Sequence, residues 1–488
     1  MIGPVPPVLP AVRARARRGR GAIGVPPPFA RGRGPLGAAA IAAALAAGLS
    51  SASAQTLTQA LAEAYNSNPQ LLAQRALLRA TDESVPQALS GWRPTVNFTG
   101  QMGGSRASFQ PNIGTSQYST FFQNSLGLQV TQPIYSGGRT IAQTRQAMNT
   151  VESTRAQTLA IETSVFQAVC TAYLDVVRDQ ALLEVARNNV RVLRKQLEAT
   201  QDRFRVGEVT RTDVAQAESS LAQAIGNETA AEGTLAQSRA EYVRAVGRPP
   251  GILLLPRERP ALPATREEAQ SLAANNNFNV IAANFAELAA RDNIDVVKSQ
   301  LLPQVSLVGS VTRQLAPSVT LSGSLENIGT IQAQMTWSLY EGGAVYSQTR
   351  QAEQTVGQRQ SQVDDARRAS VQTATDAWET LKAARASVAS FAAAVRAAPI
   401  ALAGVQQQAL VGTATTLDVL IQNQQLLTTQ QQLITAEHDA ALAEFNLAAA
   451  TGRLTAADLH LPVQLYDMER HFKEVRDKAI GFRGGLSQ

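Results

Sequence analysis

One stretch of this sequence decides its fold, and it covers residues 139–206: RTIAQTRQAMNTVESTRAQTLAIETSVFQAVCTAYLDVVRDQALLEVARNNVRVLRKQLEATQDRFRV. It contains neither glycine nor proline, so no residue in it is expected to break a helix. As one helix it would be ~100 Å long, at about 1.5 Å per residue. Helices of globular domains average about 11 to 12 residues, so this segment is not an ordinary globular element.

A turn and a returning helix follow this stretch, and the same arrangement occurs a second time. The chain is expected to reverse at Val206-Gly207 and to return as a helix over residues 212–246. The second copy consists of a long helix over residues 344–410 and a returning helix over residues 417–450. The chain therefore contains two long helical hairpins.

Two local features refine these hairpins. Thr212 and Thr416 are candidate N-caps of the returning helices, because a hydroxyl can accept a hydrogen bond from a free backbone N–H group in the first turn. The second long helix contains Gly357, Pro399 and Gly404, which are expected to bend or interrupt it.

Motifs recur along the chain at a nearly constant spacing. Tyr135-Ser136-Gly137-Gly138 recurs 205 residues later as Tyr340-Glu341-Gly342-Gly343, and the turns of the two hairpins keep this spacing. Pro94-Thr95-Val96 recurs 209 residues later as Pro303-Gln304-Val305. The change in spacing falls between two strands of each unit, which places the length difference in a loop. A long unit that occurs twice indicates duplication of a whole architectural half.

Each unit begins with a helical stretch, at residues 57–89 or 266–301, followed by two segments that alternate between apolar and uncharged polar residues. This period of two predicts four strands. Alternation alone favours a soluble hairpin packed on a core over a membrane wall. Four strands cannot close a barrel, which needs about eight, so a membrane wall requires at least two chains, and three would supply twelve strands. The apolar positions are Val96, Phe98, Met102, Leu126, Leu128, Val130, Val305, Leu307, Val311, Ile331, Ala333, Met335, Trp337 and Leu339.

The positive net charge belongs to the N-terminal segment. The chain has a net charge of +6, but residues 1–54 contain seven arginines and no acid, so the remainder carries −1. A nearly neutral mature protein argues against binding to nucleic acid. The arginines, an apolar run at 36–49 and Ala52-Ser53-Ala54 predict a signal peptide at 1–54, whose true translation start is undetermined. A disordered basic tail is the alternative.

The predicted boundaries divide the chain into five parts. These are a signal peptide (1–54), a first repeat (55–250), an inter-repeat linker (251–264), a second repeat (265–453) and a C-terminal tail (454–488), for which the sequence suggests no role.

The sequence contains no recognisable catalytic or cofactor motif. Cys170 is the single cysteine and falls within a helical run, so it is expected to be a buried structural thiol. The three histidines, His438, His460 and His471, do not have the spacing of a metal-binding helix pair. Neither a phosphate-binding loop nor a nucleophile elbow is present. We therefore expect no enzyme activity and no cofactor. No uninterrupted apolar run of the ~18 residues that a membrane helix needs follows the signal segment.

Taken together, these elements resemble the TolC family of outer-membrane efflux proteins. The resemblance covers residues 55–453. It rests on duplicated motifs at the strand-to-helix junctions and at the hairpin tips, and on one motif in the first helix. The motifs are Asn68-Pro69-Gln70-Leu71, Pro133-Ile134-Tyr135-Ser136-Gly137-Gly138, Leu339-Tyr340-Glu341-Gly342-Gly343, and the tips VGEVTRTDV (206–214) and VGTATTLDV (411–419).

The resemblance implies an α+β membrane protein of the cell outer membrane. In such an assembly a homotrimer forms a twelve-stranded β-barrel, embedded in outer-membrane lipid, that continues as an α-helical barrel across the periplasm. Its expected partners are a periplasmic adaptor protein and an inner-membrane transporter, proton-driven or of the ABC type. The function implied is an exit duct for an efflux pump or a type I secretion system. The sequence does not distinguish drugs from secreted proteins as cargo.

The tips and the junctions carry the candidate functional residues. Gly137, Gly138, Gly342 and Gly343 are expected to form the corners at which strand becomes helix. The adaptor-facing tip residues are predicted to be Val206, Gly207, Thr210, Val411, Gly412 and Thr415, although reversing the chain would require the glycines in any case.

Asp213 and Asp418 are candidates for charged rings at the periplasmic entrance, and N-terminal helix capping explains them equally well. Like charges ~8 Å apart would repel by about 2 kcal/mol at an effective dielectric constant of about 20. The sequence also departs from the best-known family member, because Ala409 and Ala414 replace the tyrosine and arginine that help to close its entrance, and Ile421 replaces an inner acid. A closed state would need other contacts.

One alternative to a channel is a soluble periplasmic coiled-coil adaptor or structural protein. Such a protein would not need four alternating strands with Gly-Gly corners. Recovery of the protein in the soluble periplasmic fraction would favour this alternative.

Overall fold

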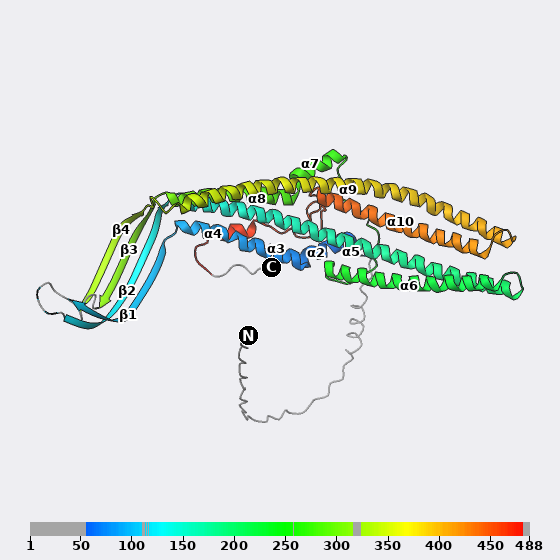
Figure 1. Cartoon of the computed structure of the whole chain (residues 1–488), viewed down its shortest axis with the longest axis horizontal. Coiled ribbons are helices and arrows are strands. Elements are labelled where there is room, and N and C mark those ends of the chain that lie inside the picture. Colours follow the sequence, from blue (N-terminus) through cyan, green and yellow to red (C-terminus); the bar gives the residue numbers. More distant parts are fainter. Residues whose placement is uncertain are drawn as a thin grey trace, which may run out of the picture. The chain divides into compact units, whose positions relative to one another are not determined.

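The computed structural model describes residues 55–481 except 110–112, 114, 116, 257 and 316–323, so the predicted signal peptide lies outside the described residues. Each half of the described chain has short helices, two strands and a long helical hairpin (Figure 1). The first half contains α2 (Leu57–Ser67), α3 (Pro69–Asp82), α4 (Ser84–Leu89), η1 (Ser90–Trp92), β1 (Thr95–Phe109), β2 (Gln117–Ser136), α5 (Arg139–Arg205) and α6 (Arg211–Val246). The second contains α7 (Arg266–Asn276), α8 (Phe278–Lys298), η2 (Ser299–Leu301), β3 (Gln304–Leu315), β4 (Leu325–Thr336), α9 (Ala344–Leu410), α10 (Thr416–Ala450) and α11 (Arg470–Val475).

The four strands form one antiparallel sheet in the order β1-β2-β3-β4. Its two edges are β1 and β4, and among the described residues neither edge has a second partner. β1 contains 15 residues and β3 contains 12, so the first strand pair is the longer one. The expectation that the length difference between the repeats lies in a loop was therefore wrong. Lengthening both strands of a hairpin adds ladder hydrogen bonds, which a longer loop would not.

The two long helices each contain 67 residues and have no break. Gly357, Pro399 and Gly404 were expected to bend or interrupt α9. The helix continues through all three positions without a break, so the predicted interruption was wrong, and it curves gently along its length (Figure 1). Pro399 lies on the exposed side of α9, where water can satisfy the carbonyl group that its missing N–H leaves free. Contacts place the long helices in the order α6, α5, α10, α9, so α6 and α9 lie at the edges of this layer.

Both long helices contain an apolar segment long enough to cross a membrane by length and composition alone. This is weak support for a membrane helix, because core helices meet the same criterion. The segment in α5 is 56% buried, whereas the segment in α9 is only 6% buried within the single chain. The edge helix α9 therefore presents an apolar surface that the chain itself does not cover.

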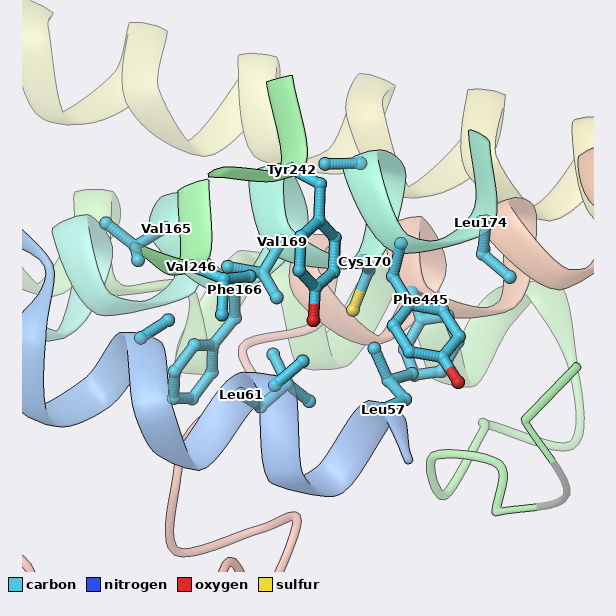
Figure 2. Close-up of a cluster of buried hydrophobic side chains, with 14 of the residues drawn as sticks. Leu57, Leu61, Val165, Phe166, Val169, Cys170, Leu174, Tyr242, Val246 and Phe445 are labelled. Atoms are coloured by element: carbon cyan, nitrogen blue, oxygen red, sulfur yellow. The ribbon is translucent and has the colours of Figure 1, made fainter. Parts of the chain in front are cut away.

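The main core lies where α2, α5, α6 and α10 meet (Figure 2). Phe166, Cys170 and Tyr242 are fully buried in it. The buried thiol of Cys170 has a pKa raised by desolvation, which agrees with the structural role expected for it. The hydroxyl of Tyr173 lies 2.9 Å from the carbonyl oxygen of Gln55 and 2.8 Å from that of Leu254, and it can donate to one of them at a time. This core joins the start of the first repeat to the inter-repeat linker.

The C-terminal tail contains the short helix α11, which contacts α3 and packs Phe472 against the cluster around Val85 of α4. The guanidinium of Arg75 lies 4.2 Å from the ring of Tyr65 and 5.0 Å from that of Tyr466. His471 Nδ1 lies 3.0 Å from Asp82 Oδ2. The tail therefore fastens the short helices of the first repeat, a role that the sequence did not suggest.

Candidate functional site: the sheet faces, the corners and the hairpin tips

One face of the sheet is apolar across all four strands. The register pairs Phe98 with Leu128, and Leu128 with Val311 in turn, so residues two apart along each strand share this face. Ile331 at the centre of β4 belongs to the same face and is 85% exposed in the single chain. An apolar face this large, which the chain itself leaves exposed, indicates a surface that another phase or another chain covers.

The opposite face is polar and nearly uncharged. Gln129, Thr312 and Gln332 lie on it, and the Oγ of Ser310 lies 2.8 Å from Thr330 Oγ1 across the β3–β4 pair. Glu326, paired with Gln314, is the one charged residue on this face among the described residues. The two faces together have the character of a wall between an apolar and an aqueous phase.

Exposed aromatic residues lie at both ends of the apolar face. Trp92, Tyr135, Trp337 and Tyr340 flank the ends of the strands nearest the helices, and the indole Nε1 of Trp337 donates to the carbonyl oxygen of Leu301 at 3.0 Å. Tyr118 and Phe122 lie toward the far end of β2. Aromatic girdles of this kind mark the two interfaces of a membrane-spanning barrel.

The corners between strand and helix contain Gly137, Gly138, Gly342 and Gly343, all in the left-handed region. Their φ values are 64°, 81°, 63° and 84°. The two corners differ in their surroundings. A Cβ atom added at Gly137 would lie 2.5 Å from the carbonyl oxygen of Ser299, whereas one added at Gly342 would meet no atom within 4 Å.

We expect Gly137→Ala to destabilise the protein more than Gly342→Ala does. Each alanine meets the left-handed backbone penalty of roughly 1–2 kcal/mol. Only Gly137→Ala adds a clash with backbone, because Ser299 cannot move away without displacing η2. Thermal unfolding of the two variants under identical conditions measures the difference. Equal losses of melting temperature would contradict the tight corner at Gly137.

The hairpin tips have the same construction in both repeats. Gly207 and Gly412 reverse the chain with φ values of 79° and 81°. Thr210 and Thr415 are the N-caps of α6 and α10, so the prediction that Thr212 and Thr416 would cap these helices was wrong. Each helix begins one residue earlier than expected, at Arg211 and at Thr416, and the threonine immediately before it supplies the capping side chain. Val206 and Val411 are both exposed at the tips.

Asp213 and Asp418 complete capping boxes with these threonines. The carboxylate of Asp213 accepts hydrogen bonds from Thr210 N at 2.8 Å and from Thr210 Oγ1 at 2.7 Å, and Asp418 makes the same two bonds to Thr415. These hydrogen bonds, first those of the hydroxyls, hold the pKa of each aspartate below its usual value. Both side chains are therefore charged at neutral pH, and the capping role expected of them is present in the structure.

A buried charged cluster joins the two hairpins. His438 on α10 is buried, with Nε2 3.0 Å from Asp175 Oδ1 on α5 and Nδ1 2.9 Å from Asp439 Oδ1. The contact of Nε2 with Asp175 is not aligned as a hydrogen bond, but it has ion-pair distance and becomes an ion pair when the imidazole is protonated. Arg178 lies 2.8 Å from both Asp175 Oδ1 and Asp179 Oδ1. Asp179 also accepts a hydrogen bond from Ser238 on α6.

Burial lowers the pKa of His438. The carboxylates of Asp175 and Asp439 raise this pKa by more than burial lowers it, so the net shift is upward. Sequence reasoning missed this cluster. The single available signal was the pair of aspartates that flank Arg178 on one long helix, and their partner lies far away on α10. Among the described residues no group of three or more His, Cys, Asp or Glu side chains is arranged to hold a metal ion.

Comparisons of sequence and of structure with known proteins point to one family. Residues 39–248 and 269–453 match the family described as "Outer membrane efflux protein". The chain is 33% identical to Outer membrane efflux protein BepC of Brucella suis, over 87% of this chain and 91% of that protein. It is 27% identical to Outer membrane protein TolC of Vibrio cholerae, over 75% and 84% of the two chains. The crystal structure of outer membrane protein VceC from Vibrio cholerae superimposes with a TM-score of 0.71, at 21% identity, over 81% and 96% of the chains.

Proposed function

Because this chain belongs to the outer membrane efflux protein family, we propose that three copies of it close into one continuous duct across the outer membrane and the periplasm. The protein is an outer-membrane channel for efflux or secretion, with its helical part in the periplasm. One observation carries the proposal of several copies. Within the described part of the chain, the sheet of four strands ends in two unpaired edges, β1 and β4, and closure requires about eight strands.

The helical layer supports the same assembly. Its edge helices are α6 and α9, and the apolar segment of α9 is left uncovered by the single chain. If β4 of one copy pairs with β1 of the next, α9 of the first copy lies beside α6 of the second. Three copies then give a barrel of twelve strands and a tube of twelve long helices.

The homotrimer and its channel activity can be tested together. Native mass spectrometry of the purified mature protein is expected to give three times the mass of one chain. Reconstitution into planar bilayers is expected to give ion-conducting channels. A soluble monomer in the periplasmic fraction would instead support the coiled-coil adaptor or structural protein.

At the hairpin tips, we propose contact with a periplasmic adaptor protein. Val206 and Val411 are exposed apolar residues beside turns that the glycines already form, so burial in a partner is an additional role for them. The adaptor would connect the duct to an inner-membrane transporter, either proton-driven or of the ABC type. The nearly uncharged polar face of the sheet suits cargoes of many kinds, and drugs and secreted proteins are both candidates.

The charges of Asp213 and Asp418 are proposed to line the periplasmic entrance and to favour cations. We expect the double variant Asp213→Asn with Asp418→Asn to lose most of its cation selectivity in bilayer recordings. Asparagine keeps a side-chain oxygen that can accept the capping bonds, so the helix starts survive while the charges are removed. Since the pKa of each aspartate is lowered, acid should weaken the selectivity of the unaltered protein only below pH 3.8.

The double variant Thr210→Ala with Thr415→Ala is the control for capping. It removes the hydroxyls from both caps, at about 1 kcal/mol each, but keeps both charges. We expect it to be less stable and to remain cation-selective. Unchanged cation selectivity in the asparagine variant would show that Asp213 and Asp418 do not form a charged entrance.

A further inference from the structure

The membrane wall is almost free of charge, and its few charged residues are placed asymmetrically. Between residues 94 and 136 and between residues 303 and 340 the sequence contains three charged residues, Arg106, Arg313 and Glu326. Both arginines lie on the apolar face of the sheet, while Glu326 lies on the polar face. No acidic residue accompanies the two arginines on their face, among the described residues.

The register fixes which way the arginines face. Arg313 lies on the same side of β3 as Val311 and Leu315, each two residues away, and it pairs with Leu126 on β2. Arg106 is two pleats beyond Met102 on the same side of β1. Both arginine residues are exposed. They therefore face outward, toward whatever surrounds the barrel.

Their height along the strands matches the thickness of the membrane. Arg106 lies eleven residues after Thr95, and Arg313 lies nine residues after Gln304, the first residues of their strands. At about 3.3 Å per residue and a tilt of about 40°, these separations correspond to roughly 28 Å and 23 Å along the barrel axis. The apolar band of an outer-membrane barrel is about 25 Å tall. Both arginines thus lie at the far edge of the band, the edge remote from the helices.

The neighbourhood of Arg106 fits an interface between lipid tails and headgroups. Its guanidinium lies 5.9 Å from the centre of the Tyr118 ring, and the residue is exposed. Tyr118 and Phe122 belong to the aromatic girdle at this end of the sheet. A guanidinium at this height meets the headgroups of the outer leaflet, whose phosphates accept its hydrogen bonds in pairs.

We propose that Arg106 and Arg313 bind the phosphate groups of outer-leaflet lipids, and so fasten the extracellular rim of the barrel to the membrane. This inference rests on the proposed channel. In a barrel of three chains, six guanidinium groups would form a ring around the wall. The occupant is a phosphorylated lipid, because the arginines adjoin the lipid-facing surface and have no acid beside them.

The test uses bisphosphorylated lipid A as the probe and the purified full-length mature protein in neutral detergent. Native mass spectrometry counts the lipids retained, and thermal unfolding gives the stabilising shift. We expect the unaltered protein to retain lipid A and to gain melting temperature from it. The double variant Arg106→Ala with Arg313→Ala should lose most of both effects, and Arg106→Lys with Arg313→Lys should keep a large part of them. Added salt should weaken the binding, because exposed ion pairs are screened.

Three controls define the outcome. Arg139→Ala with Arg350→Ala removes two exposed arginines on the helical side of the barrel and should leave lipid binding unchanged. Dephosphorylated lipid A should bind the unaltered protein no better than it binds the alanine variant. Inorganic phosphate alone should give no shift. Equal lipid retention by the alanine variant, an equal effect of the dephosphorylated lipid, or a full shift from inorganic phosphate would each overturn the proposal.

Conductance measured in parallel separates this inference from the channel itself. An alanine variant that conducts normally but no longer binds lipid A supports the inference. An alanine variant that conducts and binds lipid A refutes the inference alone, whereas an unaltered protein that never conducts refutes the channel.

Discussion

Replacing Ile331 with arginine is expected to prevent most of the protein from assembling in the outer membrane. Ile331 lies on the apolar face of the sheet, and its partner across the β3–β4 pair is Gly309, five residues into β3. That is roughly 13 Å above the start of the strand, close to the middle of the apolar band. A cation at this depth costs roughly 2–4 kcal/mol for each chain. The amount of protein recovered in outer-membrane fractions, and its urea midpoint in vesicles, measure the loss.

The neighbouring residue supplies the matched control. Gln332→Arg introduces the same side chain one position away, on the polar face of the same strand. This variant should assemble normally, and its channels should become less selective for cations, because its charge lies in the aqueous lumen. Equal assembly defects in the two variants would show that the faces are assigned wrongly, and equal recovery of both would argue against a membrane wall.

The long helices could be predicted to within a residue because their signal is local. Residues 139–206 lack any breaker, and α5 ends at Arg205. The errors arose where context outweighs local preference. Pro399 does not end α9, because the neighbouring turns hold a long helix together and its exposed side can bind water. The four additional residues of the first repeat lengthen strands, a choice that depends on pairing with a distant partner.

The candidate site shows the same division. The capping boxes of Thr210 with Asp213 and of Thr415 with Asp418 are short-range, so a spacing of three residues identifies them in the sequence, although the caps were predicted at Thr212 and Thr416. The cluster around His438 could not be predicted in this way. It exists only because α10 lies beside α5, which brings together residues more than 250 positions apart in the sequence.

Replacing His438 with alanine is expected to destabilise the contact between the two hairpins. Removing the cation leaves Asp175 and Asp439 without their shared partner, and loss of one member of a buried pair costs roughly 3–5 kcal/mol. We expect about 3 kcal/mol, the lower end of this range, because the side chain of Asp439 is 57% exposed and Arg178 still pairs with Asp175. The melting temperature of the variant at pH 6 measures this loss.

The loss should depend on pH in one direction. The pKa of His438 is raised in the folded protein above its ordinary value of 6.5, so protonation and folding favour each other. The stabilisation from His438 is therefore complete below pH 6.5 and fades as pH rises through the raised pKa. The gap in melting temperature between the unaltered protein and His438→Ala should shrink accordingly from pH 6 to pH 9. His460→Asn is the control, because His460 is exposed and asparagine tolerates its positive φ of 49°. A gap that is constant with pH would mean that His438 acts through packing alone, since only the charged imidazolium attracts both carboxylates.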